Sequence, residues 1–233
     1  MDIRRFKETL PSLLMTPSGD GAFAALRIAS HGMAGIRTAK VINFACRCMD
    51  ADEFYVEVGT FSGFTLISAG YQSNAMCFGI DDFSLEEVVK PESREEGKKL
   101  VRAALNKHLG EYGSVNCRFI ESDFRSIGLE EKTKGKLSVL FIDGKHTYTE
   151  VKDTLEKFTP YLSKDAVIIF DDVQFGNIPK YIREMLLTDE YEMLAYLVAT
   201  VNQHDTKVHL NMALDEYIAN GICVMRRINA ANS

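Results

Sequence analysis

The chain has 233 residues, of which 46% are hydrophobic, and its 27 basic and 33 acidic side chains give a net charge of −6. This length and composition suit one large domain with a full core. The negative charge and the lack of any Lys/Arg-rich block argue against a nucleic-acid or membrane partner. The N-terminal sequence lacks the apolar stretch of a signal peptide, and the five cysteines lack framework spacing. A cytoplasmic location with reduced thiols is therefore expected.

Residues 1–50 are expected to form a helical segment that is distinct from the domain at 51–233. The run from Thr38 to Met49 places several apolar residues on one helical face. A helix of this kind either packs beside the first strand or covers the active site, and the sequence does not distinguish these two roles.

The first predicted strand, 54–58, leads directly into a glycine-rich turn. The turn reads GTFSG from Gly59 to Gly63, and the residues after it predict a helix. Glycines here let a ligand approach the backbone near a helix N-terminus, or they simply tighten the packing. Glu57 makes the pattern E-x-G-x-x-x-G, which differs from the G-x-G-x-x-G of a pyrophosphate-binding turn. Because a carboxylate repels phosphates, the pattern favours a cationic cofactor without phosphate.

The second predicted strand, 75–80, ends at Asp81. An acid about 20 residues beyond a glycine turn commonly binds the hydroxyls of a ribose, and Asp81 occupies that position. The alternative is that Asp81 or Asp82 caps the next segment, where Ser84 and Glu87 form a candidate capping box.

A charged helix and a third strand are predicted next, at 92–109 and 115–120. The helix is expected to turn Leu100 inward with its other apolar residues, and Gly110 is expected to lie just beyond its end. The third strand ends near Ser122 and Asp123.

The stretch 137–173 predicts a strand, a helix and a strand. The apolar runs 137–142 and 166–170 suit strands that are buried on both faces. Between them, Thr147 and Glu150 form a candidate capping box at the start of an amphipathic helix. In a right-handed βαβ unit both strands end at the same edge of the sheet. The side chains expected to converge there are Asp143, His146, Asp171 and Asp172.

Two further strands are predicted at 191–198 and 222–227, with the segment 202–220 between them. His204 and His209 in this segment do not share a helical face. A surface loop or a partner contact is favoured there over a metal site.

Five predicted strands in succession end in an acid. In an open parallel sheet, ligands bind beyond the carboxyl ends of the strands. Crowded carboxylates raise one another's pKa unless cations neutralise them. A cationic cofactor such as S-adenosylmethionine, a hard divalent cation, or both would suit this edge. The acids are Glu57, Asp81, Asp123, Asp143, and Asp171 with Asp172.

Several motifs in the same order resemble the class I S-adenosylmethionine-dependent methyltransferases. They are VEVGTFSGFT, GIDDF, SDF, FIDGKHTY and IIFDDV. More narrowly, they are similar to the metal-dependent O-methyltransferases of the catechol and macrolide-sugar types, and I-D-G-x-H-x-Y is closest to the latter. The resemblance covers about residues 38–173. It implies a Rossmann-like α/β fold with seven strands in a mostly parallel sheet, an antiparallel C-terminal strand, and helices on both faces.

The resemblance also implies roles for individual residues. The cofactor-binding residues would be Glu57, Gly59, Thr60 and Gly63 at the methionine end, Asp81 at the ribose, Ser122 and Asp123 beside the adenine, and Asp143. Asp143, Asp171 and Asp172 match the positions that bind the metal, expected to be Mg²⁺. His146 matches the general base, and Lys145 is a less favoured substitute.

Two departures from the catechol type are visible. That type usually has aspartate–asparagine where this chain has Asp171–Asp172, and Lys164-Asp165-Ala166 replaces a common glycine pair. Without a metal, the two aspartates could instead bind the cofactor or cap the next segment. His146 could instead make only a structural hydrogen bond.

The expected function is divalent-metal-dependent O-methylation of a hydroxyl on a small molecule, namely a phenol, a catechol or a sugar diol. The alternatives are a metal-independent N- or C-methyltransferase and a non-catalytic cofactor-binding protein. A small-molecule substrate is the expected partner, and exposed N-terminal helices are compatible with a homodimer.

Overall fold

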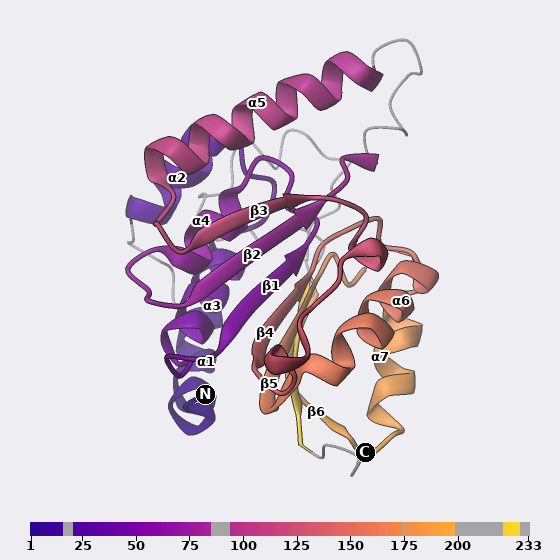
Figure 1. Cartoon of the computed structure of the whole chain (residues 1–233). Helices are drawn as coiled ribbons and strands as arrows, with labels where there is room; N and C mark the ends of the chain where they lie inside the picture. The colour runs from indigo at the N-terminus through magenta and orange to yellow at the C-terminus, as the bar shows by residue number, and fades with distance from the viewer. Residues whose placement is uncertain (16–20, 85–93, 175, 199–220, 229–233) are drawn as a thin grey trace.

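Seven strands form one sheet, in the order β3-β2-β1-β4-β5-β7-β6 (Figure 1). The computed structural model describes residues 1–15, 21–84, 94–174, 176–198 and 221–228. The strands are β1 (Phe54–Val58), β2 (Met76–Asp81), β3 (Cys117–Glu121), β4 (Leu137–Ile142), β5 (Leu162–Asp171), β6 (Tyr191–Leu197) and β7 (Ile222–Arg227). The pairs among β1–β5 are parallel, and β7 runs antiparallel to both β5 and β6. The predicted Rossmann-like α/β fold is confirmed.

Helices cover both faces of the sheet. They are α1 (Ile3–Met15), α2 (Gly21–Ser30), α3 (Ile36–Arg47), α4 (Phe64–Gly70), α5 (Arg94–Tyr112), α6 (Tyr148–Phe158) and α7 (Ile178–Leu186). Figure 1 shows α6 and α7 on one side of the sheet and the first five helices on the other. Among the described residues, no helix has the length and apolar character needed to cross a membrane.

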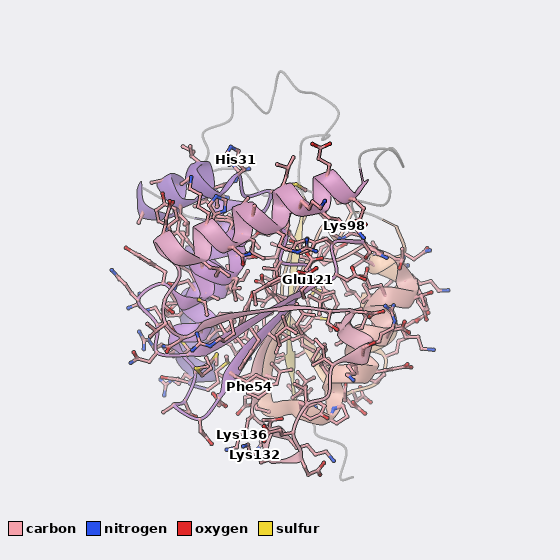
Figure 2. All side chains as sticks on the ribbon, turned by 45° about the horizontal axis from the view of Figure 1, so that its top comes forward. His31, Phe54, Lys98, Glu121, Lys132 and Lys136 are labelled. Atoms are coloured by element: carbon pink, nitrogen blue, oxygen red, sulfur yellow. The ribbon has the colours of Figure 1, made fainter. Side chains whose placement is uncertain are left out.

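The central strands β1 and β4 are buried along their whole length, as expected for parallel strands with a helical layer on each face. Alternate residues enter two separate cores. Val56 and Leu140 pack with α6 and α7, whereas Tyr55 and Val139 pack with α1 and α3. Figure 2 shows Phe54 and Lys136 at the amino ends of the strands, with Glu121 at the opposite, carboxyl edge. The functional residues are expected at that second edge.

The N-terminal helices pack on the domain. Val41 and Ala45 of α3 are fully buried in the same core as Tyr55, so α3 is a packing helix. Phe23 of α2 packs with Phe64 of α4 in a third cluster. A domain boundary at residue 50 stays a prediction.

The face of α5 that packs against the rest of the protein is not the one predicted, which included Leu100. Leu100 is 66% exposed, and Gly110 lies inside the helix, which continues to Tyr112. Leu105 and His108 are the buried residues. At 3.6 residues per turn Leu100 lies about 140° around the helix from Leu105, so both cannot face the core. The proposed capping box at Glu87 and the segment 202–220 with its two histidines lie outside the described residues.

Candidate active site

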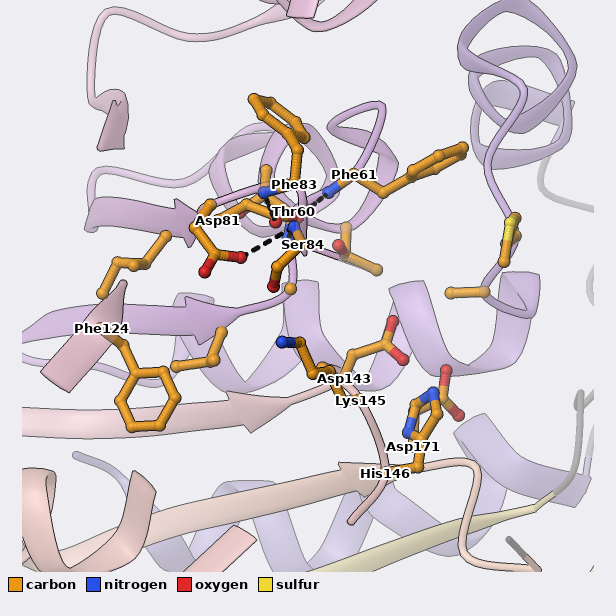
Figure 3. A pocket seen from close by; sticks show the side chains of 18 of the residues that line it. Thr60, Phe61, Asp81, Phe83, Ser84, Phe124, Asp143, Lys145, His146 and Asp171 are labelled. Carbon is orange, nitrogen blue, oxygen red and sulfur yellow. Dashed lines mark hydrogen bonds between the residues drawn. The ribbon is translucent and has the colours of Figure 1, made fainter. Parts of the chain in front are cut away.

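A cavity of about 550 Å³ lies at the carboxyl ends of the strands (Figure 3). The loops that follow β1 to β5 all contribute to its wall. Nine residues predicted from the sequence line it: Gly59, Thr60, Asp81, Ser122, Asp123, Asp143, His146, Asp171 and Asp172. Glu57 and Gly63 are predicted cofactor residues that do not line it.

The turn after β1 is held in shape by Asp81. The Thr60 and Phe61 backbone N–H groups donate to Asp81 Oδ2 at 2.9 and 2.8 Å, and the Phe83 N–H donates to Oδ1 at 2.7 Å (Figure 3). A carboxylate offers about four lone-pair positions, so these three bonds occupy most of them. Burial nevertheless raises the pKa of Asp81. Its described contacts organise the turn and the local 81–83 segment, and ribose binding stays a prediction.

Gly59 is required where it stands. Its φ is +95°, and an added Cβ would lie 2.0 Å from the Asp143 carbonyl oxygen. Any side chain would therefore push the β1 turn away from the β4 turn. This contact brings the backbone of the glycine turn directly against the first acid of the neighbouring cluster.

Asp143, His146 and Asp172 converge beside this turn. Each offers one ligand atom, and these atoms all lie within 4.8 Å of one another. Asp171 lines the same cavity, is 2% exposed, and has an Oδ1 without a hydrogen-bond partner among the described residues. The three side chains that could together hold a metal ion thus include His146, whereas the sequence predicted Asp171 as the third ligand.

The carboxylates of this cluster are in an unfavourable environment. Burial raises the pKa of Asp143 well above its ordinary value, and Asp171 and Asp172 raise it further. The pKa of Asp171 is raised well above normal by burial and then by Asp172. Buried carboxylates without a cation destabilise a fold. An oxygen-rich set with an orphaned buried oxygen fits a divalent cation.

His146 points at Asp172. Its Nε2 lies 3.1 Å from Asp172 Oδ2, and the two side chains are 21% and 17% exposed. Both residues adopt left-handed backbone conformations, with φ of +55° and +52°. Such conformations are uncommon for non-glycine residues and cluster at functional sites. Burial lowers the pKa of His146, although the charge of Asp172 acts in the opposite direction.

Comparisons with known proteins agree with this arrangement. A family model described as a methyltransferase domain matches residues 56–173, just over half of the chain. The chain belongs to this methyltransferase family. The seven-stranded sheet is that of the class I S-adenosylmethionine-dependent enzymes. A comparison with curated proteins gives no match.

Solved structures similar to this methyltransferase include two O-methyltransferases and an RNA enzyme. TomG from Streptomyces achromogenes, an O-methyltransferase involved in tomaymycin synthesis and solved with S-adenosylmethionine, is 10% identical with a TM-score of 0.63, covering 98% of this chain and 100% of its own. A putative O-methyltransferase from Klebsiella pneumoniae is 12% identical with a TM-score of 0.61, covering 91% and 92%. The tRNA (m1A58) methyltransferase TrmI from Aquifex aeolicus is 14% identical with a TM-score of 0.54, covering 82% and 68%. At these identities the likeness shows the fold alone.

Glu57 of the methyltransferase does not line the cavity. It is fully buried and accepts a hydrogen bond of 2.6 Å from the Tyr55 hydroxyl. Residues two apart in a strand share a face, so Glu57 follows Tyr55 towards the helices. Burial raises its pKa to about 8, outweighing the hydrogen bond from Tyr55. The structure therefore places Glu57 outside the cavity wall, and its contact with the cofactor stays a prediction.

Glu57→Gln should change how stability depends on pH. Folding raises the pKa of Glu57 from 4.5 to about 8, so its contribution is complete below pH 4.5 and is lost as pH rises towards 8. Glutamine keeps an acceptor for Tyr55 but cannot ionise. Thermal unfolding should show similar stabilities near about pH 5 and a variant that is more stable, by up to a few kcal/mol, at about pH 9. If the stabilities of the two proteins depended on pH in the same way, burial would not raise the pKa of Glu57 as described.

Gly63 serves the packing of α5. Its φ is +91°, and an added Cβ would lie 2.6 Å from Leu105 Cδ1. The residue therefore lets α5 approach the glycine turn, and its predicted contact with the cofactor stays a prediction.

Glu150 holds the turn that carries Asp143 and His146. The Lys145 N–H donates to its carboxylate, and its own N–H donates to Thr147 Oγ1 at 3.2 Å. The predicted capping box is thus half formed, because the acid reaches Lys145 and not Thr147. Glu150 lines the cavity, a role that the capping pattern alone does not indicate.

Aromatic side chains line the side of the cavity near Ser122 and Asp123. Phe83 and Phe124 each follow the acids at a strand end, in GIDDF and SDF, and both are buried (Figure 3). The repeated acid–phenylalanine pattern is the signal that could have identified them. The Asp123 carboxylate accepts the Arg125 N–H at 2.9 Å.

The turn between α2 and α3 forms part of the cavity wall. Arg27 of α2 and the residues Gly32, Met33 and Ala34 line the wall. Arg27 Nε donates to the Ala34 carbonyl at 2.9 Å, which ties this turn to α2. The sequence suggested the run Thr38–Met49 as a possible cover of the active site. The residues of the N-terminal segment that line the cavity come before that run in the chain.

Proposed function

We propose that this methyltransferase transfers a methyl group from S-adenosylmethionine to a hydroxyl oxygen of a small molecule, with a divalent cation, expected to be Mg²⁺. A phenol, a catechol or a sugar diol would be the substrate. The observation that carries the proposal is the cluster of Asp143, His146 and Asp172, with the orphaned Asp171 oxygen, in the cavity that the glycine turn also lines.

The cofactor-binding residues are proposed from the cavity wall. Gly59 and Thr60 would hold the methionine end, Asp81 the ribose, and Phe83 and Phe124 the flat adenine. When bound, S-adenosylmethionine supplies a sulfonium methyl group that an oxygen can attack in line, so the O–C bond forms as the S–C bond breaks. The acidic edge favours this cationic cofactor over an anionic one.

The metal would be held by Asp143, Asp171 and Asp172. When bound, a divalent cation lowers the pKa of a hydroxyl and orients it. The burial of Asp143 and Asp171 supports this role. Asp171 and Asp172 disfavour ionisation of Asp143, and Asp172 disfavours ionisation of Asp171, until a cation is present.

His146 is proposed as the proton acceptor. A carboxylate can only accept hydrogen bonds, so the 3.1 Å contact with Asp172 Oδ2 requires Nε2 to carry the hydrogen in neutral His146. Nδ1 then has the lone pair that can accept the hydroxyl proton. Burial keeps the ring neutral beforehand, and Asp172 stabilises the imidazolium that results.

The His146–Asp172 pair also supports a second candidate, a metal-independent methyltransferase. An imidazole paired with a carboxylate can accept a proton without a metal. The net charge of −6 argues against an RNA substrate for either candidate.

A screen with methyl-labelled S-adenosylmethionine tests the proposal. Purified protein would be incubated with phenols, catechols, sugar diols, amines and an unmodified tRNA, and products would be identified by mass spectrometry and NMR. Label in a methoxy group is the expected result. Label on nitrogen, on carbon or in RNA would contradict it, and binding of S-adenosylhomocysteine without any turnover would favour a non-catalytic protein.

A further inference from the structure

His108 is a buried histidine that the proposed reaction does not use. It lies on α5 with 5% exposure, and its Nδ1 is 2.9 Å from the carbonyl oxygen of Ser62, 46 residues away in the chain. A carbonyl oxygen can only accept a hydrogen bond, so Nδ1 must carry the hydrogen and donate it. The geometry therefore excludes the neutral tautomer that has its hydrogen on Nε2.

The bond from His108 is made to the glycine turn that lines the cavity. On its other side, the same turn is held by Asp81, which accepts the N–H groups of Thr60 and Phe61. Three successive residues of the turn are thus fixed by partners from two different elements. Asp81 holds the N–H groups and His108 holds the Ser62 carbonyl.

The same face of α5 makes two more contacts with the cavity wall. Leu105, one turn before His108, occupies the space that a side chain at Gly63 would need. Arg102, one turn earlier again, lies over the ring of Phe83 at 5.7 Å. One helix face therefore supports both the glycine turn and the aromatic side of the cavity.

We propose that His108 is a positioning residue for the cofactor-binding turn. Ser62 is buried, so its carbonyl would have neither His108 nor bulk water as a partner once the imidazole is removed. The turn would then relax away from its cofactor-binding shape, and affinity for the cofactor would fall. The proposal rests on cofactor binding in this cavity.

Calorimetric titration with S-adenosylhomocysteine tests it in two variants of similar size. Asparagine places its amide nitrogen where the histidine has Nδ1, whereas leucine fills similar space without a donor. His108→Leu is expected to weaken binding about tenfold, and His108→Asn to stay within about threefold of the wild type. Lys107→Ala, on the exposed side of α5, is the matched control and should leave affinity unchanged.

Thermal unfolding of each variant separates positioning from stability. A role in packing alone would lower the unfolding temperature of both variants while leaving their affinities equal, and that result would overturn the proposal. If His108→Leu does not fold, His108→Met replaces it, because its flexible side chain also lacks an N–H donor and should also weaken binding. Absence of binding by the wild type would refute the cofactor site as well, whereas equal affinities in the variants refute the role of His108 alone.

Discussion

His146→Ala is expected to slow methyl transfer by about 10²–10⁴-fold while leaving affinity for S-adenosylhomocysteine within about twofold. The imidazole is proposed to remove the hydroxyl proton, and it contacts Asp172 at 3.1 Å. Its loss removes a proton acceptor and leaves the glycine turn, which Asp81 holds separately, unchanged. Single-turnover rates and calorimetry on the same preparation would measure the two effects.

Lys145→Ala is the matched control for this variant. Lys145 is adjacent and exposed, and it holds Glu150 through its backbone N–H, which alanine retains. The control should keep most of the wild-type rate. Equal rates for His146→Ala and the wild type would remove His146 from the proton-accepting role. A loss of cofactor affinity matching the loss of rate would instead point to a collapsed cavity.

Asp143→Asn is expected to have opposite effects on stability with and without metal. The raised pKa of Asp143 means that its stabilising contribution is greatest at low pH and is lost as pH rises through the folded-state value. At neutral pH without a cation, removing this carboxylate should therefore stabilise the fold. With Mg²⁺ at about 100 times its Kd, the wild type should gain about 2.7 kcal/mol and the variant much less.

Thermal unfolding with EDTA and with Mg²⁺ measures both effects. Asp82→Asn is the control, because Asp82 lines the cavity but is outside the cluster of Asp143, His146 and Asp172. It should keep the full response to Mg²⁺. An Asp143→Asn protein that retained this response, or that was less stable than the wild type in EDTA, would contradict the metal site.

The sheet could be predicted because its central strands are continuous apolar runs. Leu137–Ile142 and Ile222–Arg227 begin and end where predicted. The acids after the parallel strands β1 to β5 had to meet at one edge. The predicted start of a strand was less accurate where an exposed turn leads into it. Val115 was predicted to lie in β3, but it is 82% exposed and precedes the strand, which begins at Cys117.

The direction of individual side chains could not be predicted as well. Strand periodicity places Glu57 on the same face as Tyr55. A strand buried on both faces has no polar alternation, however, so nothing in FYVEV indicates that this face leaves Glu57 outside the cavity wall. The charged helix α5 has a weak apolar stripe, so the sequence did not indicate that His108 lies on its buried face. His146 and Asp172 both have left-handed backbones. His and Asp are enriched among the non-glycine residues with this conformation, but residue type alone does not locate it in the sequence.

The dependence of methyl transfer on a divalent cation distinguishes the metal-dependent enzyme from the metal-independent one. With a hydroxyl substrate from the screen, the rate of labelled methyl transfer by the wild type would be measured in EDTA and again after addition of excess Mg²⁺. EDTA should reduce the rate at least about tenfold, and Mg²⁺ should restore it. An unchanged rate in EDTA would contradict the metal and would favour the metal-independent enzyme built on His146 and Asp172.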